Sequence, residues 1–133
     1  MLGKDSVVTS LRTAVDPHLH QREKNGIRIL DLHGPLTSGD SESRLRTAII
    51  AMTETRAVNV ILNFARVEEI DADGLGALVF CYAHMVHSGG ALKLLNPRPL
   101  HLSLLLRTKL NTMFEVFADE RDAVNSFSRD RVA

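Results

Sequence analysis

The segment VNVILNF at residues 58–64 restricts the fold of this chain more than any other segment. Five of its seven side chains are apolar, three of these are β-branched, and Arg56 and Arg66 flank it. A near-continuous apolar run of this length is typical of a strand that is buried on both faces, rather than of a strand with one face in water. The segment therefore predicts the central strand of a covered sheet.

Strand and helix patterns alternate along the rest of the chain. Asn25-Gly26, two residues that tolerate positive φ, separate strand-like runs near 18–23 and 27–32, which is the strongest short signal for a β-hairpin. Gly34-Pro35 is expected to end the second strand. Two further short strands are predicted at ALKLLN, residues 91–96, and at FEVF, residues 114–117.

Apolar residues at spacings of three and four predict about four helices. The first covers about 41–55, and Thr37 and Ser38 are placed to accept hydrogen bonds from its first N–H groups. The second begins at Asp73, the third carries the leucines of 102–113, and Asp119 caps the last. The order β-β-α-β-α-β-α-β-α predicts an α/β fold with a central mixed sheet of about five strands, of which the first hairpin is antiparallel.

The length of 133 residues fits one domain. We assign 1–17 to an N-terminal arm (a short helix, an added strand or disorder), 18–128 to the domain and 129–133 to a tail. The 16 basic and 16 acidic side chains cancel, which disfavours nucleic acid as a partner. No apolar run approaches the roughly 20 residues of a membrane span. We expect a cytoplasmic protein without membrane insertion, in which Cys81 is a small core residue.

The turn in EEIDADGLGALVF, residues 68–80, is the most unusual part of the sequence. Asp73 lies where a helix begins, so its carboxylate faces unpaired N–H groups and the positive end of the helix dipole, worth about 0.3 to 1 kcal/mol. It is predicted to be a helix N-cap, an interaction residue, or both at once. Asp71 closes the strand and is expected to accept hydrogen bonds from loop amides. Gly74 and Gly76 permit close approach of another backbone.

The helix that follows has two predicted sides. Its core side collects Leu75, Leu78, Val79, Tyr82, Met85 and Val86. Its opposite side collects Gly76, Ala77, Phe80, His84 and His87. A large aromatic residue on an otherwise small and polar face suits the anchor of a protein partner, and Phe80 is that residue. The alternative is that a neighbouring loop or the N-terminal arm covers Phe80.

The order of elements and the segment VEEIDADGLGALV resemble the STAS domain, the fold of bacterial anti-sigma factor antagonists. GIRILDLHGPLT, VILNFARVEEID, HSGGALKLLNP and LNTMFEVFADERDAVNSF are also similar to that family, and the match covers about 19–127. The family's turn usually reads Asp-Ser-Ser-Gly-Leu-Gly, or carries Thr. This chain reads Asp71-Ala72-Asp73-Gly74-Leu75-Gly76, and both hydroxyl groups are missing.

The resemblance implies a function in partner switching. In these antagonists the second serine is phosphorylated by a partner that is both anti-sigma factor and kinase, and the unphosphorylated form binds that partner and frees the sigma factor. The position equivalent to the phosphoacceptor is Asp73, which brings one charge and two oxygens against the −1.5 to −2 charges and three oxygens of a phosphoserine. The expected contact residues are Asp71, Ala72, Asp73, Gly74, Leu75, Gly76, Phe80 and His84. Thr37 and Ser38 are either caps or a second phosphosite, as in stressosome relatives.

Enzyme alternatives find little support in the residues. The candidate metal ligands near the turn are Glu68, Glu69, Asp71, Asp73, His84 and His87. At about 1.5 Å of rise per residue, His84 lies roughly 16 Å along the helix from Asp73, too far for a shared metal. A nucleophile elbow and a Gly-rich phosphate loop are both missing. We therefore expect no catalysis, metal or cofactor.

The expected partner is an anti-sigma factor of the serine-kinase type or another STAS-recognising protein. Some STAS domains serve instead as regulatory subunits of transporters or lipid-trafficking complexes, and others are stressosome-type scaffold components. Both roles stay open for this chain. Nucleotide binding and a weak homodimer stay open as well.

Overall fold

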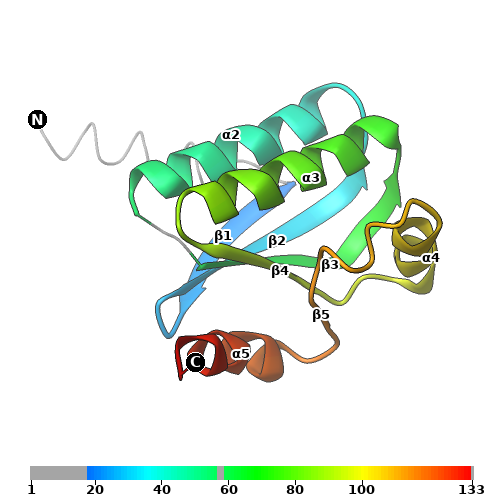
Figure 1. Cartoon of the computed structure of the whole chain (residues 1–133). Coiled ribbons are helices and arrows are strands. Elements are labelled where there is room, and N and C mark those ends of the chain that lie inside the picture. The colour runs from blue at the N-terminus through cyan, green and yellow to red at the C-terminus, as the bar shows by residue number, and fades with distance from the viewer. Residues whose placement is uncertain (1–17, 57–58, 133) are drawn as a thin grey trace, which may run out of the picture.

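The computed structural model describes residues 18–56 and 59–132. Its elements are β1 (Leu19–Lys24), β2 (Ile27–Leu36), α2 (Asp40–Glu54), β3 (Asn59–Ile70), α3 (Ala72–His87), β4 (Ala91–Leu95), α4 (Pro99–Arg107), β5 (Val116–Phe117) and α5 (Glu120–Val132). This order, shown in Figure 1, confirms the predicted alternation and the α/β class. The assignment of 1–17 to an arm lies outside the described residues.

The five strands form one mixed sheet in the order β1-β2-β3-β4-β5. The β1–β2 hairpin is antiparallel, and the other three pairs are parallel. Asn25 and Gly26 form the hairpin turn with φ of 54° and 80°, the positive values that this two-residue loop requires. The predicted mixed sheet, its antiparallel first hairpin and the central place of β3 are confirmed.

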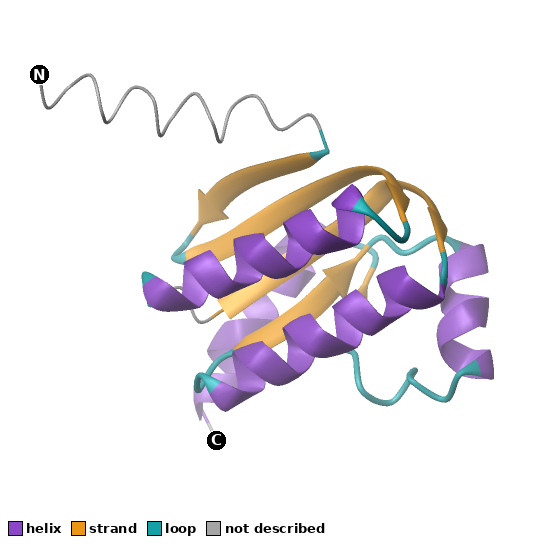
Figure 2. Cartoon of the chain, turned by 90° about the horizontal axis from the view of Figure 1, so that it is seen from above, coloured by secondary structure: helices purple, strands orange, loops and turns teal. Residues whose placement is uncertain are grey.

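Helices cover the two faces of the sheet unequally. Figures 1 and 2 show α2 and α3 side by side on one face, here called the front, and α5 on the other face, the rear. The front core packs Val60 and Leu62 of β3 under these two helices, whereas Ile61, between them, packs on the rear against α5. This alternation explains why residues 60–62 of the central strand are all apolar, as predicted.

Polar contacts also attach α5 to the rear face. Lys93 of β4 is 2% exposed, and its Nζ donates to Ser126 Oγ of α5 at 2.8 Å. The same ammonium group lies 3.1 Å from a Glu115 carboxylate oxygen and 4.3 Å from the centre of the Phe127 ring. Asp119 caps α5 by accepting from the Asp122 N–H at 3.1 Å, as predicted.

Two expected boundaries were wrong. Gly34-Pro35 does not end β2, which runs on to Leu36 beside β3 with two register irregularities. Proline is tolerated there because β1 begins opposite Leu32, so no strand among the described residues pairs with the outer edge of β2 beside Pro35. The third helix, expected over 102–113, is α4 at Pro99–Arg107, because proline favours the first helical position and Lys109 takes a φ of 63° just after the helix.

Candidate functional site

Asp71 is fixed by the fold at the junction of β3 and α3. It is the N-cap of α3, and its Oδ1 accepts from the Gly74 N–H at 2.9 Å. Its Oδ2 accepts from the Ser38 N–H at 3.0 Å, and its own N–H donates to the Leu36 carbonyl at 3.3 Å. The amides of Ser38 and Gly74 lower the pKa of the Asp71 carboxyl. The prediction that Asp71 holds the turn through loop amides is confirmed.

Gly74 is required by the packing of α3 on the end of β2. It is buried, and a Cβ at this position would lie 1.9 Å from the carbonyl oxygen of Leu36. No larger side chain fits unless the helix moves away from the strand. Gly76 is different, because its Cβ would meet only Arg46 Nη2 at 3.8 Å, an ordinary contact distance. Of the two glycines expected to permit close approach, only Gly74 does so.

Asp73 lies in the first turn of α3 and is exposed, as is Ala72 beside it. Asp73 is not the N-cap, so this expectation was wrong: Asp71 occupies the cap, where its carboxylate reaches two loop amides. Within the described part of the chain, no hydrogen bond or ion pair engages the Asp73 carboxylate. Its remaining local interaction is with the positive end of the helix dipole, worth about 0.3 to 1 kcal/mol.

The loop before α2 contacts the turn through its backbone. Helix α2 has Gly39 as its N-cap and no capping side chain, so the expectation that Thr37 and Ser38 cap it was wrong. The Thr37 N–H donates instead to Ser41 Oγ at 2.9 Å, because the hydroxyl lies inside the first turn and reaches back. Ser38 is exposed, and its N–H binds Asp71. The loop and the α3 turn are thus adjacent.

The helical phase expected for α3 was partly wrong. The residues of α3 that are buried are Gly74, Ala77, Leu78, Cys81 and Met85. Ala77, expected on the outer side, is fully buried, and Val86, expected in the core, is 50% exposed. Small residues face the sheet because α3 approaches it closely, as at Gly74. Cys81 is a core residue as predicted, and burial raises the pKa of its thiol to about 12.

Phe80 and His84 lie against α2 rather than in open solvent. Phe80 is half-buried and packs on the front core, with the Arg46 guanidinium carbon 4.9 Å from its ring centre. The His84 ring stacks on it at 5.6 Å, and His84 Nε2 is 2.9 Å from Thr53 Oγ1 of α2. Within the described residues, Phe80 is therefore covered by α2 rather than by a neighbouring loop, and the N-terminal arm considered from the sequence lies outside those residues.

The seam between these two helices brings in residues that sequence reasoning missed. Arg46 Nε of α2 is 2.7 Å from Glu42 Oε2, and both side chains stay partly exposed. The signal for this pair was present, because an acid four residues before a base is a favourable helical spacing. We define the α2–α3 seam by Glu42, Arg46, Thr53, Phe80 and His84.

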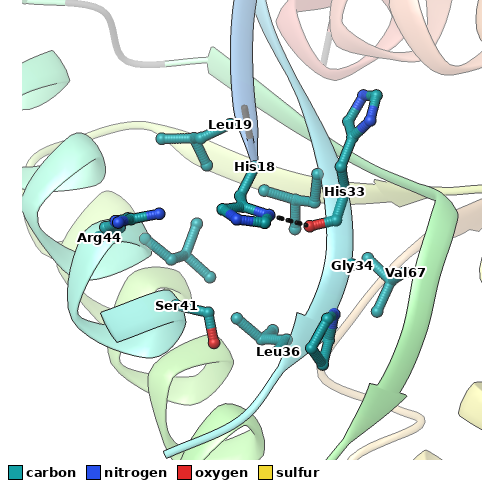
Figure 3. A pocket seen from close by; sticks show the side chains of 11 residues that line it. His18, Leu19, His33, Gly34, Leu36, Ser41, Arg44 and Val67 are labelled. Atoms are coloured by element: carbon teal, nitrogen blue, oxygen red, sulfur yellow. Dashed lines mark hydrogen bonds between the residues drawn. The ribbon is translucent and has the colours of Figure 1, made fainter. Parts of the chain in front are cut away.

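A small hollow lies beside this site, between β2 and the first turn of α2 (Figure 3). His18 Nδ1 lies 3.3 Å from the His33 carbonyl at its rim. The hollow has a volume of about 20 Å³, which holds little more than one water molecule, so the hollow is unsuited to a ligand.

The chemistry of the site is that of a contact surface. No group of three or more metal-type ligands converges within 18–56 and 59–132. The Cys81 thiol is buried and protonated at neutral pH, so it is no nucleophile. Over the same described ranges, no helix combines the length and hydropathy that crossing a bilayer demands. What the site offers is a rigid turn, an exposed carboxylate and the mixed aromatic and charged α2–α3 seam.

Comparison with known proteins places this fold in a family. The chain matches a putative anti-sigma factor antagonist from Thermotoga maritima at 18% identity and a TM-score of 0.76, over 81% of this chain and 92% of that one. It matches the Bacillus cell fate determinant SpoIIAA in the phosphorylated form at 22% identity and a TM-score of 0.64, over 86% and 99%. A sulfate transporter family protein from Wolinella succinogenes matches at 23% identity and a TM-score of 0.67, over 84% and 91%.

At identities of 18% to 23%, these structural matches establish a shared fold. No curated protein sequence matches the chain. The profile of the STAS domain family matches residues 18–123, which is most of the chain. The protein therefore belongs to the STAS domain family.

Proposed function

We propose that the protein is an anti-sigma factor antagonist-like regulator, which binds an anti-sigma factor of the serine-kinase type in a partner-switching pathway that controls transcription. The contact surface is the α3 turn with the adjoining α2–α3 seam. The observation that carries this proposal is Asp73. It is an exposed carboxylate without a partner in the described chain, at the position where the family resemblance expects a phosphoacceptor hydroxyl.

The geometry of the turn supports a binding role for Asp73. Asp71 and Gly74 set the shape of the turn, so the side chain at 73 can vary without altering the backbone around it. A fixed carboxylate supplies negative charge at the amino end of a helix, where a phosphate would also be favourable. It is neither added by a kinase nor removed by a phosphatase. The interaction therefore does not switch at this position.

The composition of the α2–α3 seam supports a role in binding. The seam combines a half-buried aromatic ring with an arginine, and both residue types are enriched at the centres of protein interfaces.

The test is the affinity of the anti-sigma factor for three forms of the protein. Wild type, Asp73→Ser and Asp73→Ala are titrated calorimetrically, without ATP, against each kinase-type anti-sigma factor of the same genome. We expect both variants to differ from wild type by roughly tenfold, as for a charged group at an interface. Tighter binding of the serine form means that Asp73 mimics the phosphorylated state. Weaker binding of both means that the partner has adapted to a carboxylate.

A matched control separates Asp73 from charge in general. Asp122 is another exposed acid in the first turn of a helix, α5, on the rear face. Asp122→Ala should leave the affinity unchanged. Equal affinity for wild type and both Asp73 variants would refute a binding role for Asp73, and absence of binding to every anti-sigma factor would refute the proposed function.

One observation favours a second candidate, a regulatory subunit of a transporter. The match to the sulfate transporter family protein covers 84% of the chain with a TM-score of 0.67. A transporter subunit should co-purify with a permease or an ATPase that is encoded beside it. A stressosome-type scaffold component, the remaining alternative, should instead form large assemblies. The gene neighbourhood and the mass of the native complex decide between these roles.

A further inference from the structure

Within the described residues, the rear face of the sheet is only partly covered. Helix α5 packs on Ile27, Ile29 and Ile61, and beyond these residues, towards the carboxyl ends of β2 and β3, the rear face turns polar. One open hollow of about 500 Å³ lies there, lined by His20, His33, Ala65 and Arg66 among others. A second, of about 390 Å³, is lined by Ala65, Arg98, Leu102 and Val116 among others. Ala65 lines both, so the two hollows adjoin, and together they are here called the rear groove.

A bulge in β3 shapes the centre of this groove. Asp31 pairs with Asn63 and His33 pairs with Arg66, so β3 contains one more residue than β2 between these pairs. The Ala65 N–H donates to Asn63 Oδ1 at 3.1 Å, which holds the bulge. Ala65 and Arg66 are consecutive and both exposed, and Val67 returns to the front core. The bulge thus presents an arginine on the rear face.

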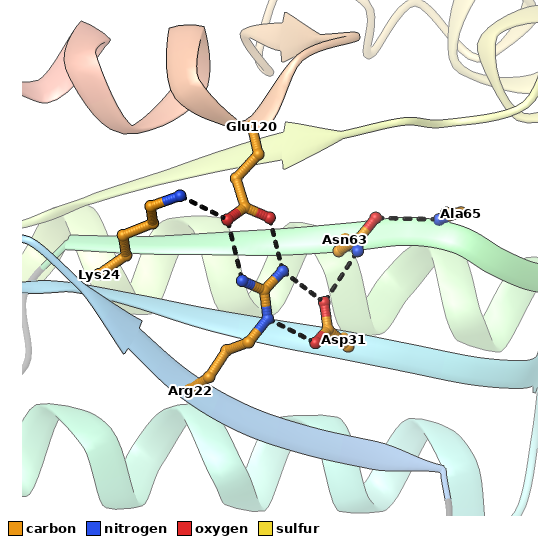
Figure 4. Close-up of polar contacts among 6 residues, drawn as sticks. All are labelled: Arg22, Lys24, Asp31, Asn63, Ala65 and Glu120. Carbon is orange, nitrogen blue, oxygen red and sulfur yellow. Dashed lines mark hydrogen bonds and ion pairs between the residues drawn. The ribbon is translucent and has the colours of Figure 1, made fainter.

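The charges beside the groove cancel at one end. Figure 4 shows Arg22 between Asp31 and Glu120, with Nε 2.7 Å from Asp31 Oδ2 and Nη2 2.6 Å from Glu120 Oε1. Lys24 adds a longer contact to Glu120 at 3.5 Å, and the Asn63 amide donates to Asp31 at 2.8 Å. Burial disfavours the Asp31 carboxylate, but the hydrogen bonds from Arg22 and Asn63 outweigh it and lower its pKa. Two cations and two anions therefore balance in this network.

The remaining charges leave the groove basic. Within the described residues, Arg66 forms no ion pair, and the Arg98 guanidinium donates to the Ala65 carbonyl at 3.3 Å without pairing with a carboxylate. His20 and His33 also line this part of the groove. The far end is apolar, because Leu102 is 42% exposed and Val116 is 39% exposed. The groove thus combines uncompensated arginines with an exposed apolar end.

We propose that the rear groove binds an acidic segment of a protein partner that also carries a large apolar side chain. Carboxylates of the segment lie at Arg66 and Arg98, and the apolar side chain packs on Leu102 and Val116. A small anion would use the arginines but would leave the apolar end uncovered. The groove lies on the opposite face of the sheet from α2 and α3, so it can be occupied together with the α3 turn, and it does not rest on the function proposed above.

The probe is a short synthetic peptide with glutamates flanking two leucines, titrated into the ¹⁵N-labelled full chain and followed by NMR. We expect amide shifts at 63–66, Asn96, Arg98 and 116–118, and none at 71–76. The same peptide with lysine in place of each glutamate should cause no shifts. If the acidic peptide leaves 63–66 unshifted, or the basic one shifts them equally, the proposal is wrong.

Variants test the two ends of the groove separately. Arg66→Glu should weaken binding of the acidic peptide by roughly tenfold, since it reverses a charge at the contact. Leu102→Ser should weaken it as well, whereas Arg129→Glu, an exposed site on α5 that lines neither hollow, should not. Dispersed spectra of each variant confirm folding. If inorganic phosphate binds at 63–66 as tightly as the peptide and Leu102→Ser has no effect, the groove is a small-anion site and the proposal fails.

Discussion

The inner and outer sides of the α3 turn contain the same residue types in opposite surroundings. On the inner side, Asp71 accepts from two amides, and Gly74 lies so close to β2 that no Cβ fits. On the outer side, Asp73 is exposed without a partner in the described chain, and Gly76 has room for a side chain. The inner side builds the turn, and the outer side is free to meet another protein. A family can therefore keep this fold while the residue at 73 changes.

The largest expected difference between the two sides is at the glycines. Gly74→Ala places a Cβ 1.9 Å from the Leu36 carbonyl oxygen, so α3 or β2 must move. We expect the free energy of unfolding to fall by about 3 kcal/mol or more, at the upper end for overpacking. Gly76→Ala should raise it by up to about 1 kcal/mol, because alanine is the better helix former and its Cβ meets no clash.

Urea unfolding followed by circular dichroism measures both variants. The two changes are identical in chemistry and lie one half-turn apart, so helix propensity cannot account for opposite signs. Equal effects of Gly74→Ala and Gly76→Ala on the free energy of unfolding would show that the close approach of α3 to β2 is not as described.

The second difference is between the aspartates. Asp71→Ala removes the acceptor of both the Gly74 and the Ser38 amides, so the urea midpoint should fall. Asp71→Asn keeps one side-chain oxygen as an acceptor, so its urea midpoint should fall less than that of Asp71→Ala. A midpoint for Asp71→Ala that equals that of wild type would contradict the capping role.

The pH dependence of stability sharpens the same comparison. The pKa of Asp71 is lowered in the folded protein, so its contribution is present above the unfolded-state pKa of about 3.9 and is lost as the pH falls through the folded-state pKa. Wild type should therefore lose more stability than Asp71→Ala on acidification below about pH 4. Midpoints of urea unfolding at a series of pH values give this difference, and parallel curves for the two proteins would count against it.

The smallest expected effect on stability is at Asp73. Asp73→Ala removes only a favourable interaction with the helix dipole, so the free energy of unfolding should fall by no more than about 1 kcal/mol. Raised salt should reduce this difference, since the site is exposed. A loss as large as that of Asp71→Ala would mean that Asp73 has a structural partner.

The sequence predicted most of the fold because its local signals agree. The Asn25-Gly26 turn, the apolar central strand and the helical spacings each indicate one structure, and the elements occur in the expected order. The bulge that presents Arg66 was not predictable, since an extra residue in a strand leaves no local signature when the register of its neighbour is unknown. The effect of Pro35 on β2 was wrongly predicted for a similar reason, because a proline is tolerated there only where β1 does not pair with β2, and this depends on where β1 begins.

The candidate site was predicted less completely. Asp71 and Asp73 both satisfy the residue preference of an N-cap, so only the position of Ser38 in space separates them. The phase of α3 was ambiguous because residues 77–82 are apolar all round, and the choice of buried side is made by the tight packing of Gly74 and Ala77. Arg46 was missed because the pairing of α2 with α3 is a tertiary contact.

The most direct test of the account is the effect of ATP on the complex with a kinase-type anti-sigma factor. Wild type and Asp73→Ser are each incubated with the partner and Mg²⁺-ATP, and intact mass and affinity are then measured. The account predicts that wild type gains no phosphate and keeps its affinity, whereas Asp73→Ser gains one phosphate and is released. A phosphate gained by wild type, at Thr37, Ser38 or elsewhere near the turn, together with an ATP-dependent loss of affinity, would contradict it.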